Sequence, residues 1–507
     1  KENRGREAQR NNLTAAKLVA EVVKSSLGPR GMDKMLVDTL GDVTITNDGA
    51  TILKEIDVQR PAAKMIVEVA KSVDNEVGDG TTSSVVFAGA LLEKAEQLLE
   101  KNVHPSVIID GYTAAAEEAL RVLEKLAIKI KTDDKEILIK IANTCMASKL
   151  VSEDSPTLSK IVVDATGQIG ETNEKTKSIK VDLDNIKVEK KAGGAIDDTV
   201  LIKGIVLDKE VVHGGMPKRI VKAKIALINS ALEIEKTEIS AEIRISDPQQ
   251  MHMFLEEENR MLKAMVEKIK GSGANVLLCQ KGMDDIAQHH LAKEGILGVR
   301  RVKESDMYKL SKATGGRIVN NIDDLTSKDL GSADLVEERK VETDKWVFIE
   351  GCKNPKAVTI LARGGSQRVV DEADRSLHDA LMVMKDVLEK PAIVAGGGAP
   401  EAFVANHLRS WSSKLEGREQ LAALKFAEAL ETLPICLAEN AGMDPIDTMA
   451  ELRAKQGKGI KWTGIDVRNA TVADMYKLNI LEPVVVKEQI IKSATEASCM
   501  LLRIDDV

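Results

Sequence analysis

The N-terminal part of the chain has the hydrophobic spacing of packed helices. In segments 61–71 and 85–100, apolar residues recur every three or four positions and so share one helix face. The first of these segments opens with proline, which favours the first position of a helix. Between the early helices, residues 35–53 hold β-rich runs on either side of Leu40–Gly41, which is the pattern of a hairpin. We therefore predict that residues 13–130 are mainly helical with one hairpin.

The middle of the chain changes its period. Residues 179–230 contain strand-like runs separated by glycine and proline turns, and short runs at 275–280 and 298–302 alternate with helical segments. From residue 366 onward the pattern is helical again. This order predicts an α/β domain inserted into a helical one. Periodicity alone does not show that the two chain ends meet.

One segment of the middle region is rich in methionine. Asp247 and Pro248 form a favourable helix start, with the aspartate as N-cap and the proline at the first position. Such a stripe is consistent with a core face, and also with an adaptable contact surface, because methionine is flexible and polarizable. The apolar residues of the helix that follows are Met251, Phe254, Leu255, Met261, Leu262, Met265, Val266 and Ile269.

Composition narrows the class of protein. Of the 507 residues, 43% are hydrophobic and 30% are charged, as in soluble proteins of roughly two to four domains. The net charge of −8 argues against a general nucleic-acid binder. No apolar run approaches the ~18 residues of a membrane span, and the start, which lacks methionine, shows no secretory signal. Five scattered cysteines are typical of reduced thiols. We expect a cytoplasmic protein with no nucleic-acid or membrane partner.

A glycine-rich turn, Gly78-Asp79-Gly80-Thr81-Thr82, stands directly before the second helical segment. Its glycines let a ligand approach the backbone, and the groups that follow lie at a helix N-terminus, which favours phosphate. Asp79 is the kind of carboxylate that holds Mg²⁺ beside phosphate oxygens. No lysine follows, so the turn is not the GxxxxGK[ST] loop. The same residues are equally consistent with a capped turn that merely starts a helix.

Three further segments are weaker signals on their own. Residues 26–31 form a glycine-bearing loop after a helix, which is the usual pattern of a helix C-cap. Residues 46–51 contain Asn-Asp-Gly, so Asp48 is either a turn residue or a carboxylate aimed at a bound phosphate or its attacking water. Residues 394–399 form a third glycine cluster. Asp379 lies on the helix before it, where an aspartate is usually solvated.

The order of these motifs is specific although each alone is not. The chain resembles the chaperonin family, and in particular its group II branch of archaeal thermosomes and the eukaryotic cytosolic chaperonin, over essentially its whole length. The resemblance implies a multidomain α and α/β fold, in which both chain ends build a helical equatorial domain. The motifs that carry it are LGPRGMDKML (27–36), NDGATIL (47–53), GDGTT (78–82), HDAL (378–381), VAGGGAPE (394–401) and GIDV (464–467).

The resemblance also implies where the domains begin and end. The equatorial domain takes residues 1–133 and 391–507, and a small hinge domain takes 134–198 and 352–390. An α/β apical domain takes 199–351 and carries a helical protrusion at about 240–270, which coincides with the methionine-rich helix. Such a protrusion serves as a built-in lid, so no separate co-chaperonin is implied.

Functional roles follow from the resemblance position by position. Asp48 and Asp379 resemble the carboxylates that position and activate the attacking water. Asp79 resembles the ligand of Mg²⁺, and Lys149 resembles the residue that senses the terminal phosphate. The remaining implied contacts to ATP or ADP are Ser26, Leu27, Gly28, Pro29 and Asn47 in the pocket wall, Gly80, Thr81, Thr82 and Ser83 around the phosphates, and Gly397, Asp466 and Glu482 at ribose and adenine.

The implied function is ATP-driven protein folding. Its partners are unfolded client proteins and other copies or paralogues of the same subunit in a stacked double ring. One alternative is a kinase or other phosphotransferase, which the absence of a Walker lysine and of a kinase signature set disfavours. Another is a subunit that does not hydrolyse ATP, which the presence of Asp48, Asp79 and Asp379 disfavours. Pro391, just before the third glycine cluster, stands where we expect a more flexible polar turn.

Overall fold

The chain forms two compact units. Both ends of the chain belong to unit 1, and most of the middle belongs to unit 2, so the sequence of unit 1 is interrupted by that of unit 2. Unit 1 comprises 1–163, 172–181 and 371–507, and unit 2 comprises 164–171 and 182–370. The computed structural model describes residues 6–37, 41, 43–56, 58–149, 151–172, 179–234, 248–353 and 355–504.

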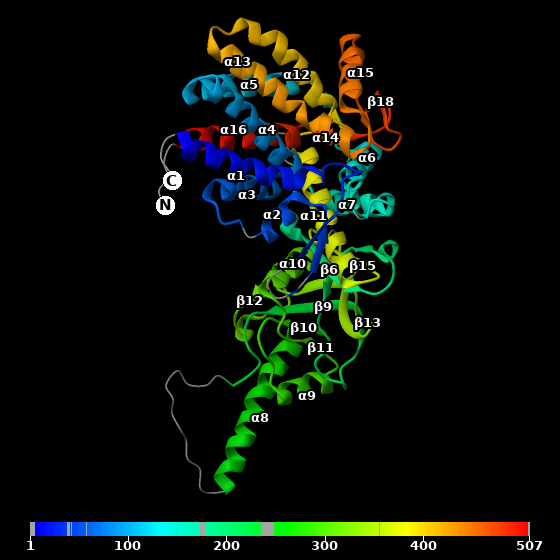
Figure 1. Ribbon diagram of the computed structural model, residues 1–507. Helices are drawn as coiled ribbons and strands as arrows, with labels where there is room; N and C mark the ends of the chain where they lie inside the picture. Colours follow the sequence, from blue (N-terminus) through cyan, green and yellow to red (C-terminus); the bar gives the residue numbers. More distant parts are fainter. Residues whose placement is uncertain are drawn as a thin grey trace. The chain divides into compact units, whose positions relative to one another are not determined.

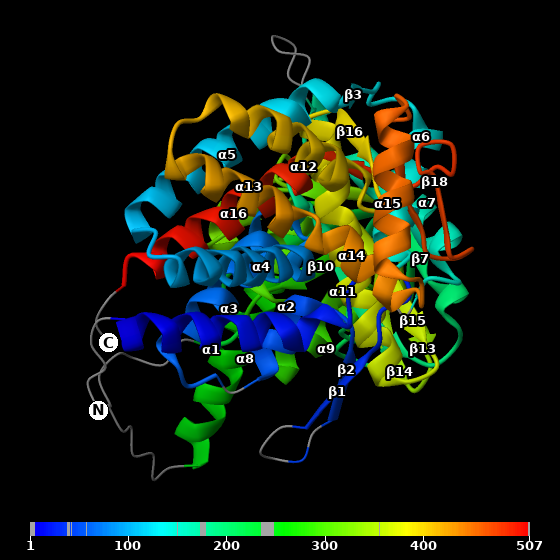
Figure 2. The ribbon, with the colours of Figure 1, turned by 45° about the horizontal axis from the view of Figure 1, so that its top comes forward.

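Unit 1 is mainly helical, as the apolar spacing predicts. Three of its longest helices, α1 (Arg6–Lys24), α4 (Thr81–Glu100) and α16 (Val484–Leu502), lie side by side in Figure 2. A Cβ at Gly89 of α4 would lie 2.3 Å from the Cβ of Ala20 in α1, so glycine is what lets these two helices approach. Few aromatic residues are present, and the core is built mostly from alanine, valine, isoleucine and leucine.

The remaining elements of unit 1 include three small sheets, β1–β2, β19–β16–β3 and β17–β18. The helices are α2 (Gly49–Glu55), α3 (Pro61–Val77), α5 (Pro105–Leu126), α6 (Lys135–Met146), α12 (Ala399–Trp411), α13 (Arg418–Leu430), α14 (Thr432–Asn440) and α15 (Pro445–Gly457). The strands are β1 (Lys34–Val37), β2 (Val43–Thr46), β3 (Ile128–Lys129), β5 (Ile179–Lys180), β16 (Ala392–Ala395), β17 (Thr463–Asp466), β18 (Thr471–Asp474) and β19 (Leu481–Pro483). The unit boundary divides α7 (Ser155–Ile169), β4 (Glu171–Thr172) and α11 (Gln367–Glu389).

Several element predictions for unit 1 need correction. The hairpin is confined to β1 and β2, and residues 49–55 are the helix α2, because Asp48 caps a helix there. Leu40, in the predicted turn, lies outside the described residues. Helix α4 begins at Thr81, four residues earlier than predicted. Pro391 is followed by a strand, β16, which pairs with β3 and β19, so the segment is not a flexible turn.

Unit 2 is the predicted α/β region. Its seven-stranded sheet has the order β11–β10–β9–β13–β14–β8, with β12 also pairing with β9, and its three-stranded sheet has the order β6–β15–β7. The larger sheet is visible around β9, β10 and β13 in Figure 1. The elements are β6 (Ile186–Ala192), β7 (Val200–Ile202), β8 (Gly204–Leu207), β9 (Arg219–Ile228), α8 (Pro248–Gly271), β10 (Val276–Cys279), α9 (Asp285–Lys293), β11 (Leu297–Val299), α10 (Glu304–Thr314), β12 (Ile318–Val319), β13 (Gly331–Val341), β14 (Asp344–Glu350) and β15 (Val358–Gly364). The strand predicted at 298–302 is shorter, because it ends at Val299.

The methionine-rich helix α8 is a core element in one half and exposed in the other, so the core-face interpretation holds for part of it. Its C-terminal half packs into the core of unit 2 through Leu262, Val266 and Ile269. Its N-terminal half extends away from the sheet of that unit (Figure 1), and Met251 and Phe254 are 57% and 52% exposed. The predicted cap Asp247 and the part of the predicted protrusion at 240–247 lie outside the described residues. Among the helices that the structure describes, none is long and apolar enough to cross a membrane.

Candidate functional site

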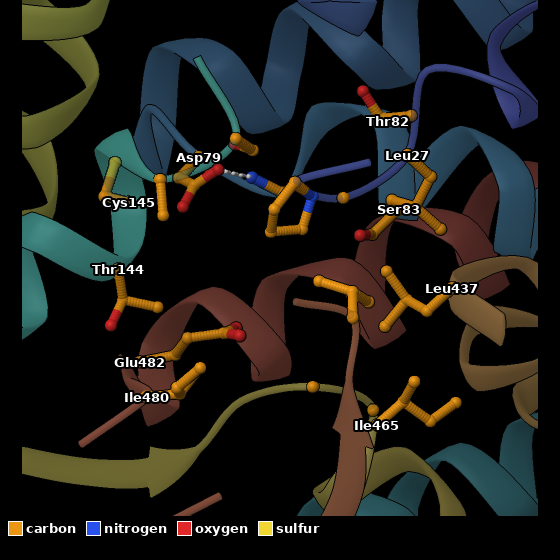
Figure 3. Close-up of a pocket in the computed structure, with 18 of the residues that line it drawn as sticks. Leu27, Asp79, Thr82, Ser83, Thr144, Cys145, Leu437, Ile465, Ile480 and Glu482 are labelled. Carbon is orange, nitrogen blue, oxygen red and sulfur yellow. Dashed lines mark hydrogen bonds between the residues drawn. The ribbon is translucent and has the colours of Figure 1, made fainter. Parts of the chain in front are cut away.

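A cavity of about 370 Å³ in unit 1 collects almost every residue that the sequence singles out. Figure 3 shows part of its wall. Asp379 is not in the wall, and it reaches the cavity through a contact with Lys149. The predicted residues that line the cavity are Ser26, Leu27, Gly28, Pro29, Asn47, Asp48, Asp79, Gly80, Thr81, Thr82, Ser83, Lys149, Gly397, Asp466 and Glu482.

The turn between α3 and α4 presents a helix N-terminus to the cavity. Gly78 and Gly80 have φ values of 68° and 81°, in the left-handed region that glycine adopts at low cost. Gly80 is itself the N-cap of α4, and having no side chain it cannot cap the first turn. The amide groups there are therefore available to a ligand, and the positive end of the helix favours an anion. The backbone N–H of Gly80 also donates to Asp79 Oδ1 at 2.7 Å, which fixes that carboxylate at the mouth of the turn.

Three charged side chains form a cluster beside this turn, which we call the phosphate-end cluster: Asp48, Lys149 and Asp379. Lys149 Nζ lies 2.7 Å from Asp379 Oδ2 and 3.7 Å from Asp48 Oδ1. All three side chains are almost fully buried. Asp48 is the N-cap of α2, and its Oδ2 accepts hydrogen bonds from the Thr51 N–H and hydroxyl, each at 2.8 Å. One buried ammonium therefore serves two carboxylates.

The two carboxylates of this cluster differ in proton affinity. Burial raises the pKa of Asp379 well above its ordinary range, with Asp48 and Asp79 adding to the rise and Lys149 opposing it. Burial also disfavours the ionised form of Asp48, but Lys149 and the bonds from Thr51 outweigh burial and lower the pKa of Asp48. Asp48 is thus a fixed negative charge, whereas Asp379 has the higher basicity that suits a proton acceptor.

The loop after α1 lines the cavity as predicted. Gly28 has a φ of 82°, and a Cβ there would lie 2.4 Å from Leu437 Cδ2, so a larger residue would collide with the wall. Leu27 and Leu437 both lie on the right-hand side of the view in Figure 3, with Leu437 below Leu27. The side-chain amide of Asn47 donates to the carbonyl oxygen of Ser148, which ties the Asp48 turn to the residue before Lys149.

Another part of the cavity wall is built by the third glycine cluster, the β17–β18 hairpin and strand β19. The Ile465 N–H donates to the Gly397 carbonyl at 2.8 Å, which joins β17 to the glycine turn. Asp466 is buried, and its carboxylate accepts from the Arg468 N–H at 3.1 Å and from the Asn469 side chain at 2.7 Å. Glu482 lies on β19 and extends into the cavity (Figure 3).

Two charged residues of the wall have no role in the sequence prediction. Glu401 and Lys487 are both buried in the cavity wall, and Lys487 Nζ lies 2.8 Å from Glu401 Oε1 and 2.5 Å from Glu482 Oε2. A signal was present, because Lys487 follows three valines and Glu401 stands among apolar residues of the glycine motif. Charged residues in such surroundings are almost never fully buried unless they are paired.

Unit 2 contains a separate acidic group, formed by Glu189, Asp208 and Asp306. Lys187 already supplies positive charge to it, with Nζ 2.6 Å from Glu189 Oε1 and 2.9 Å from Asp306 Oδ2. The same Nζ donates to the carbonyl oxygen of Val206 at 2.8 Å. Lys187 therefore pairs with two of the three carboxylates. Asp208 Oδ2 lies 3.7 Å from Lys303 Nζ, and Asp208 Oδ1 has no hydrogen-bond partner among the described residues.

Known proteins are similar to this chain over nearly its whole length. The family model described as the TCP-1/cpn60 chaperonin family matches residues 19–507. A thermosome subunit of Pyrococcus horikoshii is 58% identical over 503 residues, covering 99% of this chain and 91% of the relative. Thermosome subunit alpha of Archaeoglobus fulgidus is also 58% identical over 503 residues, covering 99% and 92%. Thermosome subunit alpha of Sulfolobus acidocaldarius is 56% identical over 513 residues, again covering 99% and 92%.

Proposed function

This chain belongs to the TCP-1/cpn60 chaperonin family, and from that premise we propose that the cavity of unit 1 is its ATPase centre. The chain is a subunit of a group II chaperonin, an ATP-dependent machine that forms rings and folds other proteins. Family membership decides against the phosphotransferase alternative and against a subunit without ATP hydrolysis. What we propose is which residues of the cavity perform the hydrolysis.

The phosphate-end cluster is the observation that carries the assignment. Two carboxylates and a lysine converge beside an open helix N-terminus, so a terminal phosphate bound at α4 would lie next to a proton acceptor and a cation. ATP hydrolysis transfers a phosphoryl group to water, and positioning and electrostatics supply most of the catalysis. We assign the acceptance of the water proton to Asp379, since its pKa is raised, and the orientation of that water to Asp48.

The remaining residues divide between phosphates and nucleoside. Lys149 neutralises charge on the terminal phosphate and senses its presence, and the α4 N-terminus from Gly80 to Ser83 holds the phosphate oxygens. Ser26 to Pro29 and Asn47 form the wall beside the nucleotide. Gly397, Asp466 and Glu482 lie at the end that we assign to ribose and adenine.

Asp79 fits the ligand of a magnesium ion. One of its oxygens accepts from the Gly80 N–H, which leaves the other oxygen for the metal. Mg²⁺ is usually held by one or two carboxylates together with phosphate oxygens and water, so a single fixed carboxylate beside the phosphate site is sufficient. When bound, Mg²⁺ would offset the charge that develops on the phosphates.

The domain layout is the second part of the proposal. We assign 1–133 and 391–507 to an equatorial domain, 134–198 and 352–390 to a hinge domain, and 199–351 to an apical domain. The division of the chain into two units, with α11 crossing the boundary, supports an arrangement in which Asp379 moves with the hinge. The exposed apolar half of α8 supports a built-in lid and unfolded proteins as clients. We further propose that the subunits form a stacked double ring without a separate co-chaperonin. We place the assembly in the cytoplasm.

Asp379→Asn tests the catalytic assignment. It keeps the shape of the side chain and removes its basicity, so steady-state hydrolysis should fall by about a hundredfold or more while calorimetric affinity for ATP changes little. Asp386→Asn is the matched control, because Asp386 is also buried on α11 but its charged neighbours are Lys385, Glu389 and Glu76 and not Lys149. We expect its turnover to match the unaltered chain. Turnover within threefold of normal in Asp379→Asn would remove Asp379 from the mechanism.

A further inference from the structure

Glu401, Glu482 and Lys487 form a second buried cluster in the cavity wall, which we call the nucleoside-end cluster after the role that we assign to Glu482. Its members come from three elements: Glu401 from the first turn of α12, Glu482 from β19 and Lys487 from the first turns of α16. Lys487 Nζ bridges the two carboxylates at 2.8 and 2.5 Å. The Lys487 and Glu401 side chains are 10% and 8% exposed, whereas Glu482 is 22% exposed. Glu482 is therefore the member that meets a ligand.

One polar atom of this cluster has no hydrogen-bond partner among the described residues. A lysine ammonium has three donors, and two of those on Lys487 meet Glu401 and Glu482. Glu401 Oε2 is buried and has no hydrogen-bond partner among the described residues. Two carboxylates and one ammonium leave one net negative charge in the cavity wall. Buried charge of this kind is costly unless something retains it, which makes a packing role alone an insufficient explanation.

The backbone beside Glu482 is shaped around its carboxylate. A Cβ at Gly396 would lie 2.3 Å from Glu482 Oε1 and 3.1 Å from its Cδ. Gly396 does not have a positive φ, so its conformation does not require glycine. The Gly396 N–H also donates to the Ile480 carbonyl at 2.9 Å, which holds this part of the backbone against the segment that leads into β19. Glycine at this position thus leaves the space that the Glu482 carboxylate occupies.

We propose that Lys487, held by Glu401, is a positioning residue that fixes the Glu482 carboxylate against Gly396, where it accepts a hydrogen bond from a donor group of the nucleoside. The inference rests on the proposed function, since it takes ATP as the occupant of the cavity. A carboxylate accepts hydrogen bonds and does not donate them. ATP offers three donor groups outside its phosphates, namely the 2′ and 3′ hydroxyls of ribose and the 6-amino group of adenine.

The donor is identified with nucleotide analogues on the assembled full-length chain. Calorimetry compares ATP with 2′-deoxyATP, 3′-deoxyATP and purine riboside triphosphate, each of which lacks one donor. The analogue without the bonded group should bind the unaltered chain about tenfold to a hundredfold more weakly, as expected for a lost bond to a charged acceptor. In Lys487→Met, ATP itself should weaken by a similar factor and the difference between ATP and that analogue should fall below about threefold.

A kinetic measurement separates positioning from general damage. Because the nucleoside end does not touch the reacting phosphate, Lys487→Met should raise KM while kcat at saturating ATP stays within about threefold. Lys487→Met combined with Glu401→Gln keeps the single net negative charge of the cluster, so it tests whether Lys487 only balances charge. We expect the pair to restore thermal stability and not to restore discrimination among the nucleotides.

Gly396→Ala tests the same position without altering any charge. The added methyl displaces the Glu482 carboxylate, so the discrimination should again be lost. Full discrimination in both Lys487→Met and Gly396→Ala, or its return in the charge-matched pair, would overturn the inference. If the unaltered chain binds ATP and Asp379→Asn loses turnover, such a result rejects only the role of Lys487. If the unaltered chain fails to bind ATP, the proposed function itself is rejected.

Discussion

Unit 1 contains two clusters that carry the same set of charges in different surroundings. Each places one buried lysine between two carboxylates, Lys149 at the phosphate end and Lys487 at the nucleoside end. At the phosphate end, Asp48 is further stabilised by hydrogen bonds from Thr51, and the two carboxylates differ in proton affinity. At the nucleoside end, burial raises the pKa of Glu482 against the effect of Lys487. Under the proposed function, the same set of charges serves proton transfer in one cluster and recognition in the other.

The elements that carry the clusters explain this difference. All three members of the nucleoside-end cluster lie on elements that belong wholly to unit 1. At the phosphate end, Asp379 lies on α11, a helix that the unit boundary divides. A residue on such a helix is subject to motions of the inserted region, and a residue on β19 is not. Under the proposed assignments, the charge that we assign to catalysis lies on a helix that crosses the unit boundary, and the charge that we assign to recognition does not.

Removing the lysine from each cluster is the strongest test of this contrast. Lys149→Met leaves two buried carboxylates without a cation, so Asp379 should hold a proton at neutral pH and lose its function as a base. We expect kcat to fall by about 10²- to 10⁴-fold, and stability to fall by roughly 3–5 kcal/mol because a buried pair is broken. Lys487→Met should cost similar stability and act on KM. Steady-state kinetics and thermal unfolding of both variants provide the comparison.

The contrast between the two clusters would fail if both lysine substitutions had the same kinetic effect. If Lys487→Met lowered kcat as much as Lys149→Met, the two clusters would act as one electrostatic unit. If Lys149→Met changed only KM, the phosphate-end assignment would fail while the cavity could still bind nucleotide. Melting temperatures measured on the same preparations show whether either effect arises from partial unfolding.

The pH dependence of turnover gives the next largest effect. Because the pKa of Asp379 is raised, the base should become protonated, and kcat should fall, at a pH well above the ~3.9 of an ordinary aspartate. Asp48, whose pKa is lowered, should stay ionised throughout. Lys149 opposes the rise, so the acid limb should move to still higher pH in Lys149→Met. The measurement is kcat at saturating Mg-ATP across the acid range. An acid limb at the ordinary aspartate pKa would exclude Asp379 as the base.

The sequence predicted the fold class and most of the cavity residues. It did not predict the buried charged residues that pair with them. Asp48 and Asp79 were expected as acidic groups near phosphate, and both line the cavity, because short motifs with glycines impose local geometry that the sequence displays. Asp379 looked like a solvated helix residue, and only the resemblance to the family indicated its role. Its burial depends on packing against segments hundreds of residues away, which no local pattern encodes.

The nucleoside-end cluster shows the same limit more clearly. Glu401 and Lys487 are separated by 86 residues, and no spacing rule connects residues so far apart. Two β-strands, β16 and β19, bring their neighbourhoods together by antiparallel pairing of Val394 with Glu482. The start of α4 was also misplaced, since the apolar pattern begins at residue 85 while the helix begins with polar residues from Thr81. These polar first-turn residues, Thr81 to Ser83, line the cavity.

The smallest expected effect comes from removing the Thr51 hydroxyl, which donates a hydrogen bond to Asp48 in the phosphate-end cluster. Thr51→Val removes one of the two hydrogen bonds from Thr51 to Asp48 Oδ2 and leaves the backbone bond in place. The pKa of Asp48 should rise, because one contribution that lowers it is lost, yet Lys149 still stabilises the carboxylate. We therefore expect kcat to fall by less than about tenfold, with KM and nucleotide discrimination unchanged.

Thr51→Ser is the matched control, since it retains the hydroxyl and removes only a methyl group. It should keep nearly full activity if the hydrogen bond to Asp48 is what matters. Equal loss in the serine and valine variants would assign the effect to packing of α2 instead. A loss in Thr51→Val as large as that in Lys149→Met would mean that Asp48 orientation, and not the shared ammonium, dominates the phosphate end. The contrast between the two clusters would then lie in the N-cap of α2, which the nucleoside end lacks.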